Sequence, residues 1–60
     1  MYAIFYYRDF GGKWTIRVQN TKTYEYVETK EYDLPSHLID IIVKSFVDAY
    51  PNSYACEVKY

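Results

Sequence analysis

The chain has 60 residues, of which half are hydrophobic and a quarter charged, and its formal net charge is −1 with a pI of about 5.6. This length and composition predict one globular domain, spanning residues 1–60, and exclude a disordered chain. One cysteine and one histidine exclude an internal disulfide and argue against a zinc site, and the acidic balance argues against direct nucleic-acid binding.

The first half of the chain predicts a β-hairpin. Residues 2–8 are rich in β-forming types and show no helical spacing. Asp9-Phe10-Gly11-Gly12 follows, and its Gly-Gly pair supplies the positive φ angles of a tight turn. Residues 13–19 then alternate between apolar and polar types, as a half-buried strand does. The apolar face carries Trp14, Ile16 and Val18.

A third, more acidic strand is expected over residues 23–32, although its last residues, from 29 on, could already belong to a loop. Regular alternation would place three tyrosines on one side together with Glu28 and Lys30, and these tyrosines are Tyr24, Tyr26 and Tyr32. The opposite side would carry Val27 among charged residues. The mixed faces and the charges are typical of an edge strand that discourages pairing between chains.

A helix is predicted from Leu34-Pro35-Ser36 to about Tyr50, with Asp33 or Ser36 as its cap and Pro51 ending it. Its apolar arc is expected to consist of Leu38, Ile39, Ile42, Phe46, Ala49 and Tyr50, flanked by Val43 and Val47 on one side and by Ile41 on the other. Residues 53–60 alternate again, and we expect the inward set to be Tyr54, Cys56, Val58 and Tyr60.

The element order β-β-β-α-β predicts an α+β fold. Strands 1 to 3 form a meander, and a right-handed crossover through the helix lays the last strand parallel to the first. The sheet order is therefore 3-2-1-4, with a single helix packed on one face and the other face left open.

No arrangement of residues indicates catalysis. His37 stands beside Ser36 and three residues before Asp40, a pattern that is more typical of a capped, solvated helix start. Cys56 is expected to be a buried, inert thiol. The acidic residues have neither metal-ligand spacing nor a phosphate-binding loop beside them. We therefore expect a non-enzyme with no catalytic residues, no metal and no cofactor.

The aromatic content favours a binding protein. Tyr, Phe and Trp make up 22% of the residues, and nine are tyrosines. Because a domain of about 60 residues buries only about 60% of the surface of its unfolded chain, several rings should lie outside, where tyrosine commonly contacts partner proteins. The predicted partner-binding residues form the acidic, tyrosine-rich segment: Tyr24, Glu25, Tyr26, Glu28, Glu31, Tyr32 and Asp33.

This segment suits a partner protein with a basic surface. Two alternatives use other surfaces. The helix flank with Val43 and Val47 is a possible homodimer contact. The open sheet face, where aromatic residues accompany Arg17, is a less favoured RNA-binding surface.

Two resemblances narrow these expectations. Over the first twenty residues of the chain, the opening hairpin resembles the start of HicB-type antitoxins, from the aromatic first strand through Asp9-Phe10-Gly11-Gly12 to Trp14-Thr15-Ile16-Arg17-Val18. The order of this turn, the acidic tyrosine stretch, Leu34-Pro35-Ser36, a helix and a last strand is similar to that of small phage anti-CRISPR proteins. The second resemblance implies a non-enzyme that blocks a Cas-type nucleoprotein complex, with Glu25, Glu28, Glu31 and Asp33 facing Arg or Lys.

The expected location is the cytoplasm, which would be that of the host cell for a phage protein. No apolar run approaches the ~20 residues of a membrane span. The first residues lack the basic segment of a signal peptide, and an unpaired cysteine suits a reducing compartment.

Overall fold

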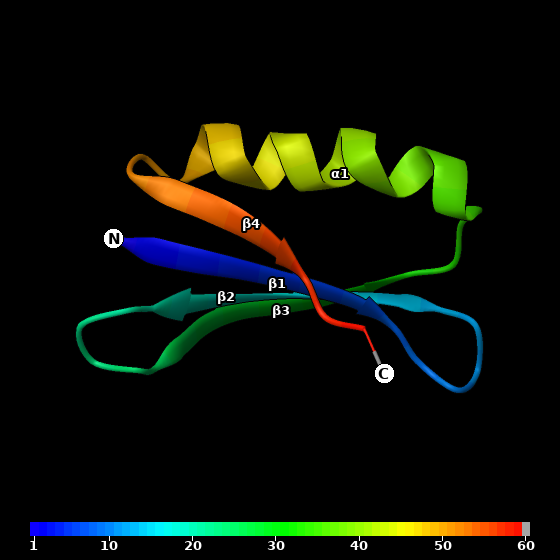
Figure 1. Cartoon of the computed structure of the whole chain (residues 1–60), viewed down its shortest axis with the longest axis horizontal. Coiled ribbons are helices and arrows are strands. Elements are labelled where there is room, and N and C mark those ends of the chain that lie inside the picture. The colour runs from blue at the N-terminus through cyan, green and yellow to red at the C-terminus, as the bar shows by residue number, and fades with distance from the viewer. Residues whose placement is uncertain (60) are drawn as a thin grey trace.

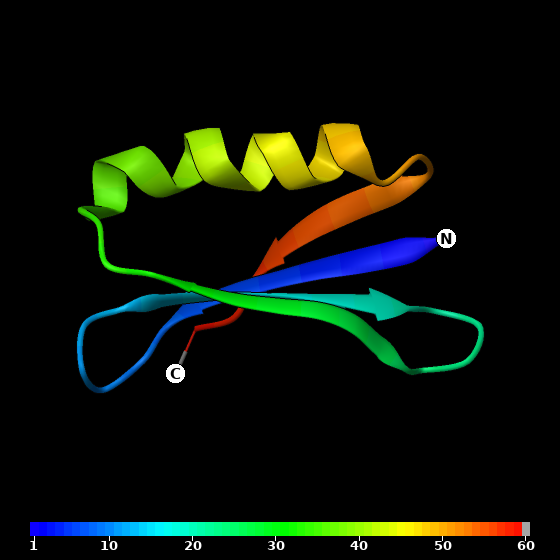
Figure 2. The same cartoon turned by 180° about the vertical axis from the view of Figure 1, so that it is seen from behind.

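The computed structural model describes residues 1–59 and contains four strands and one helix in the order β-β-β-α-β. The strands form one mixed sheet in the order β3-β2-β1-β4, and α1 lies along one side of it (Figure 1; Figure 2 shows the same arrangement from behind). The predicted α+β fold and strand order are confirmed. The bounds are β1 (Tyr2–Arg8), β2 (Trp14–Asn20), β3 (Tyr26–Tyr32), α1 (Ser36–Ala49) and β4 (Ser53–Glu57).

The first hairpin forms as the sequence predicts. β1 and β2 pair antiparallel from Tyr2 opposite Asn20 to Arg8 opposite Trp14. In the turn, the Gly12 amide donates to the Asp9 carbonyl at 3.0 Å, and Gly12 has a φ of +81°, which residues with a Cβ adopt only at a cost. The Asp9 side chain accepts a further bond from the Lys13 amide at 3.0 Å, so the turn is held from both sides.

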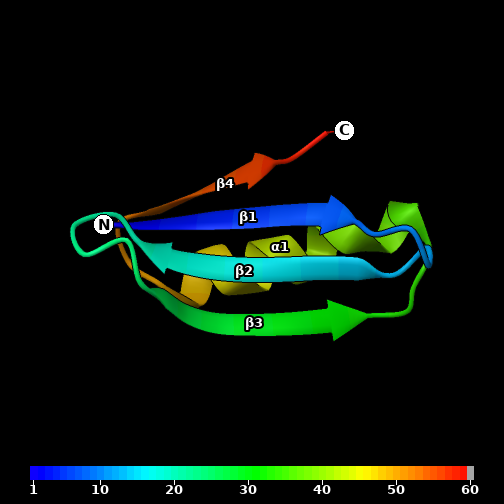
Figure 3. The ribbon, with the colours of Figure 1, turned by 90° about the horizontal axis from the view of Figure 1, so that it is seen from below.

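The crossover through α1 returns the chain beside its own start. β4 pairs parallel to β1, with Tyr2 next to Ser53 and Tyr6 next to Glu57. Seen from the side opposite the helix, the sheet lies in front of α1, and β4 diverges from β1 along its length (Figure 3). One face of the sheet is therefore covered by α1, and no element within residues 1–59 lies over the other face.

The core lies between α1 and the two central strands. β1 contributes Ile4, β2 contributes its whole predicted apolar face, and α1 contributes three residues. The buried set is Ile4, Trp14, Ile16, Val18, Ile39, Val43 and Phe46. Tyr2 and Tyr6 pack against this cluster, so the even-numbered residues of β1 face the helix, and Ala3, Phe5 and Tyr7 face away.

The predicted faces of the last strand are wrong. Parallel pairing with β1 places Ala55 beside Ile4 on the helix side and places Tyr54 and Cys56 beside Ala3 and Phe5 on the open side. Cys56 is accordingly exposed rather than buried. The cause lies in the short connection after α1, because the Ser53 hydroxyl donates to the Val47 carbonyl at 3.3 Å and fixes the odd-numbered residues on the helix side. The predicted position of Tyr60 lies outside the described residues.

The predicted start of the helix needs one correction. Pro35 occupies the N-cap position, and no side chain caps the helix, although Asp33 or Ser36 was expected to do so. The Ser36 hydroxyl instead accepts a hydrogen bond from Arg8 Nη1 at 3.3 Å. The end of the helix agrees with the prediction: Ala49 is the last helical residue, and Tyr50 is the C-cap, with an extended backbone directly before Pro51.

The apolar arc of α1 is rotated relative to the prediction. Val43 is buried at its centre, with 6% of its surface exposed, and Val47 packs against the core. The exposed apolar residues are instead Leu38 and Ile41. The expectation that Val43 and Val47 form an accessible flank for a homodimer is therefore wrong, because both already contribute to the core of one subunit.

A β-bulge divides β3 into two parts. Glu28 pairs with Val18, but the next pair joins Tyr26 to Gln19, so Val27 is an extra residue. Beyond the bulge the alternation is inverted, and Tyr26 lies on the open face while Glu28, Lys30 and Tyr32 face the helix. The expectation that Tyr26 shares a side with Glu28 is wrong for this reason, and β3 continues through residues 29–32 without becoming a loop.

Candidate partner-binding surface

The uncovered side of the sheet carries an aromatic surface, which we call the open face. Strand register assigns to it Phe5 and Tyr7 from β1, Arg17 from β2, Tyr26 from β3 and Tyr54 from β4. Two small residues beneath these side chains, Ala3 and Thr15, are 1% and 5% exposed although no helix covers them. Their burial indicates that the larger side chains lie over them and form a continuous layer.

Arg17 and Tyr26 form the best-defined contact on the open face. The Arg17 guanidinium carbon lies 3.7 Å from the centre of the Tyr26 ring, which is a cation–π contact. The Arg17 Nε is buried and has no hydrogen-bond partner among the described residues. Stacking on Tyr26 therefore restrains the guanidinium without using its donors, so the charge is held in place for a partner.

A shallow hollow lies beside this pair. It has a volume of about 300 Å³ and is lined by Phe5, Tyr7, Arg17, Tyr26 and Val58. Most of this lining is aromatic or aliphatic, and Arg17 supplies a charge at its wall. Such a hollow can accept an apolar side chain of a partner.

The predicted binding segment contributes unequally to accessible surface. Tyr24 is 73% exposed in the β2–β3 turn, and Tyr26 is 48% exposed on the open face. Glu25, Glu31 and Asp33 are also exposed, and Glu31 pairs with Thr15, which places its side chain on the open face. We call these three carboxylates the acidic margin.

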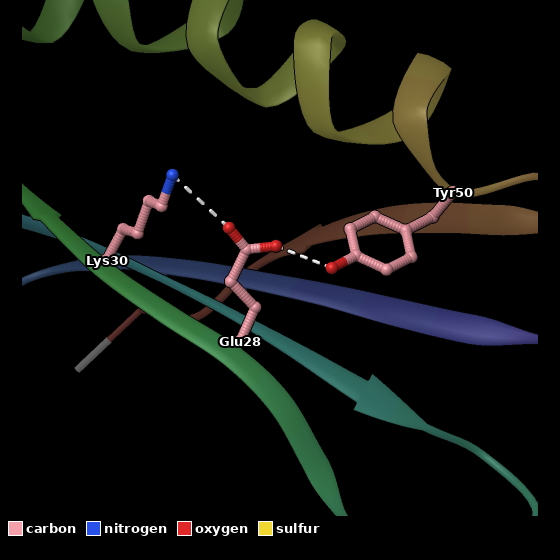
Figure 4. A network of polar contacts seen from close by, with 3 residues as sticks. All are labelled: Glu28, Lys30 and Tyr50. Carbon is pink, nitrogen blue, oxygen red and sulfur yellow. Dashed lines mark hydrogen bonds and ion pairs between the residues drawn. The ribbon is translucent and has the colours of Figure 1, made fainter.

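The two remaining predicted residues contact the rest of the domain. Tyr32 packs against the core, with its ring edge-to-face to Phe46 at a centroid distance of 6.5 Å. Glu28 accepts a hydrogen bond from the Tyr50 hydroxyl at 2.5 Å and forms an ion pair with Lys30 at 3.4 Å (Figure 4). These contacts tie β3 to the end of α1.

The charge in this network shifts two pKa values in opposite directions. The hydrogen bond from Tyr50 is the main cause of the lowered pKa of Glu28, and Lys30 adds to it. The same bond is the main reason that the pKa of Tyr50 is raised to about 12, with burial contributing. Both shifts favour an ionised Glu28 bonded to a neutral Tyr50, which identifies the pair as a structural contact.

The structure does not assemble a catalytic group around the residues that were considered for one. His37 is exposed on α1, and Ser36 is engaged by Arg8. Within residues 1–59, no group of three or more His, Cys, Asp or Glu side chains could hold a metal ion. No helix in the same part of the chain is long and apolar enough to cross a membrane.

Several aromatic residues outside the predicted binding segment also have accessible surface. Phe10 is fully exposed at the tip of the β1–β2 turn, and Tyr54 is 49% exposed on the open face. Phe5, half-buried beside Arg17, completes the hollow. Phe10 could have been identified from the sequence, because a ring inside a four-residue turn between two strands has no core to enter.

Comparisons with known proteins found no relative of this chain: no family model, no curated protein and no solved structure matches it. The open face, the acidic margin and their geometry are therefore the basis for a functional proposal.

Proposed function

We propose that this domain is a non-enzymatic protein-binding module that presents its open face and acidic margin to a partner protein. The supporting observation is the aromatic layer on the uncovered side of the sheet, organised around the Arg17–Tyr26 contact. Tyr and Arg side chains carry a large share of the binding energy in protein interfaces, and they do so where they bury together. The open face provides these side chains on rigid strands, so little order has to be gained on binding.

The acidic margin indicates the kind of partner. Glu31 is exposed on the open face, Glu25 and Asp33 are exposed just before and just after β3, and no ion pair occupies the three among the described residues. A partner with Arg or Lys around an apolar centre would match this pattern. A basic nucleic-acid-binding surface of a nucleoprotein complex has this character, so we propose that the domain acts as an inhibitor of such a complex, of the Cas type or related to it.

The surface assignment can be tested with substitutions that leave the core intact. Tyr26→Ser and Tyr54→Ser remove half-exposed rings from the open face, and Ile41→Ser makes a comparable change on the outer side of α1. We expect the first two variants to lose most of the partner captured by the immobilised wild type, and Ile41→Ser to retain it. Equal capture by all three variants would contradict the use of the open face.

The inhibitor role has a separate test. Purified Cas-type effector complexes are mixed with the protein, and binding of target DNA is measured by a gel shift. We expect inhibition that weakens with rising salt and is reduced at least tenfold by combining Glu25→Lys with Glu31→Lys, because attraction between exposed charges is screened. Inhibition that is unchanged in the double variant would refute the electrostatic mechanism.

Single-stranded RNA is the second candidate partner, because several aromatic side chains beside an arginine on an open sheet can stack bases. The charge distribution disfavours it: the net charge is −1, and Glu31 lies on the same face. A gel shift with a mixed-sequence RNA at low salt tests this candidate, and the absence of any shift would remove it. Light scattering at micromolar concentration tests the homodimer, which a strict monomer excludes.

A further inference from the structure

The open face is large for a domain of this length. Seven-residue strands and the spacing between four of them give it dimensions of roughly 20 by 20 Å. Rings from three strands lie on it at half-buried or exposed positions, and they are Phe5, Tyr7, Tyr26 and Tyr54. A contiguous aromatic surface of this kind marks a site of association. The charges on and around it indicate what it can associate with.

The charges on the open face are balanced. Among the described residues that the strand register places there, Arg17 and Glu31 alone carry a charge. Glu31 pairs with Thr15, and Arg17 pairs with Thr29, so the two charges lie on neighbouring strands and two residues apart along the sheet. A surface with one cation and one anion is complementary to a second copy of itself related by a two-fold axis.

Arg17 and Glu31 do not neutralise each other within one copy. The Arg17 guanidinium carbon lies 3.7 Å from the centre of the Tyr26 ring. Tyr26 pairs with Gln19, whereas Glu31 pairs with Thr15, so this contact draws the guanidinium away from Glu31 along the sheet. No ion pair joins the two side chains in the described part of the chain. Each charge can therefore meet its opposite on a second copy.

The surroundings of the open face do not keep two copies apart. Charged residues beyond the strand ends are three of each sign, namely Asp9, Lys13, Lys22, Glu25, Asp33 and Lys59. The other charges in the strands lie on the helix side by register, and they are Arg8, Glu28, Lys30 and Glu57. The formal net charge of the whole chain is only −1, so long-range repulsion between copies is weak.

We propose that two copies of this domain pack open face to open face about a two-fold axis, with Arg17 of each copy beside Glu31 of the other. The aromatic layers form the centre of the contact, and both helices lie outside, as in a sandwich of two sheets. Two faces of this size would bury on the order of 800–1,000 Å² in total. Because stable complexes bury about 1,200 Å² or more, the dimer dissociates readily.

The association needs no other protein, so it goes beyond the proposed function and either can fail without the other. Its effect on binding, in contrast, rests on the proposed function. A partner protein and a second copy would compete for the open face, and self-association would mask this surface at high concentration.

Sedimentation equilibrium of the protein alone tests the association. The sample is kept reduced, because Cys56 is exposed and a disulfide between copies would imitate a dimer. Between about 5 and about 500 µM we expect a reversible monomer–dimer equilibrium, as a small interface predicts. In ¹⁵N–¹H spectra over the same dilution series, amides of the strands around Arg17 should shift, and those of α1 should not. A strict monomer at the highest concentration, or shifts confined to α1, would overturn the proposal.

Charge reversal identifies the contact. Glu31→Arg leaves two cations on the open face and Arg17→Glu leaves two anions, so each variant alone should associate at least tenfold more weakly than the wild type. An equimolar mixture of the two variants should form a heterodimer, because each then meets the opposite charge. Asp48→Arg is the matched control: it changes the net charge as Glu31→Arg does, at an exposed position on α1, and should leave the association unchanged.

Two results would refute the pairing of Arg17 with Glu31. One is a mixture that associates no better than its components, and the other is an equal loss of association in Asp48→Arg. Arg17→Glu also removes the contact with Tyr26, and its spectrum reports whether the fold is retained. If this variant does not fold, Glu31→Arg at its exposed position decides, because an affinity equal to that of Asp48→Arg contradicts the proposal.

Discussion

Replacing Tyr50 by Phe isolates the contact that joins the end of α1 to β3. The change removes only the hydroxyl that donates to Glu28, while the ring can keep its contact with Tyr2, whose centroid lies 5.1 Å away. A rise in the pKa of Tyr50 from 10 to about 12 corresponds to at most about 2.7 kcal/mol, at about 1.4 kcal/mol for each unit. The side chain of Glu28 is 27% exposed, so solvent screens the contact, and we expect a loss of about 1 kcal/mol.

The pH dependence of this loss follows from the two pKa shifts. The raised pKa of Tyr50 means that its contribution is complete below pH 10 and disappears as the pH rises towards 12. The lowered pKa of Glu28 means that its contribution is complete well above 4.5, the ordinary value, and disappears as the pH falls through its lower value in the folded state. The difference between wild type and variant should therefore be largest on a plateau between about pH 6 and pH 9.

Thermal unfolding followed by circular dichroism measures the difference. For a domain of this size, about 1 kcal/mol corresponds to a decrease in Tm of roughly 4–8 °C at pH 7. Tyr24→Phe, at a position that is 73% exposed, is the matched control and should leave Tm nearly unchanged. In a Glu28→Gln background the effect of Tyr50→Phe should shrink to well under half. An undiminished effect in that background would refute the reasoning, because the loss would then not come from the charged hydrogen bond.

Three further predictions concern the first turn, the core and the last strand. Gly12→Ala should lower the free energy of unfolding by about 1 kcal/mol because Gly12 has a positive φ. Gly11→Ala is the control and should change this free energy by less than about 0.5 kcal/mol, because the added Cβ would meet Asp9 Oδ1 at an ordinary 3.4 Å. Equal urea midpoints for the two variants would contradict this prediction. Ile16→Val should cost about 1 kcal/mol in urea unfolding because Ile16 is fully buried, and a cost near zero would place the core elsewhere. Cys56 should react with a thiol reagent in the native protein as fast as in urea, and a reaction limited by unfolding would contradict its exposed position.

The fold could be predicted from the sequence because several independent signals agree. The hairpin turn, the clean alternation of β2 and the proline at each end of the helix limit the element order, and the handedness of the crossover then fixes the sheet order. The face of β2 that enters the core follows from its residue types. The same signals do not determine which face of β4 is covered.

The failure at β4 has a definite physical cause. Alternation with a period of two defines two sets of side chains but does not say which set faces the helix. In β4 the more apolar set, Tyr54 and Cys56, lies on the open side, because the choice depends on how Ser53 meets the end of α1. The hydrogen bond from Ser53 to Val47 forms only in the folded chain, so the pattern of residues in β4 does not predict it.

The candidate surface was predictable in part. The exposed acidic residues of β3 could be recognised from their type, whereas the roles of Glu28 and Tyr32 depend on contacts with α1. The position of Tyr26 depends on the bulge, for which the sequence offers no glycine or other marker. The hollow beside the start of α1 was not predicted, because Arg8 and Trp14 meet Asp40 and Glu57 only in the folded chain.

Because of the extra residue in β3, substitutions at the two ends of this strand should affect different properties of the domain. Before Val27, a substitution at Tyr26 alters what the outer surface offers and leaves the interior unaffected. After it, a substitution at Tyr32 disturbs packing against Phe46. In a complete substitution scan scored separately for folding and for binding, substitutions before Val27 should therefore affect mainly binding, and substitutions after it mainly folding. Deleting Val27 should place Tyr26 directly before Glu28, so that regular alternation keeps Tyr26 on the open face.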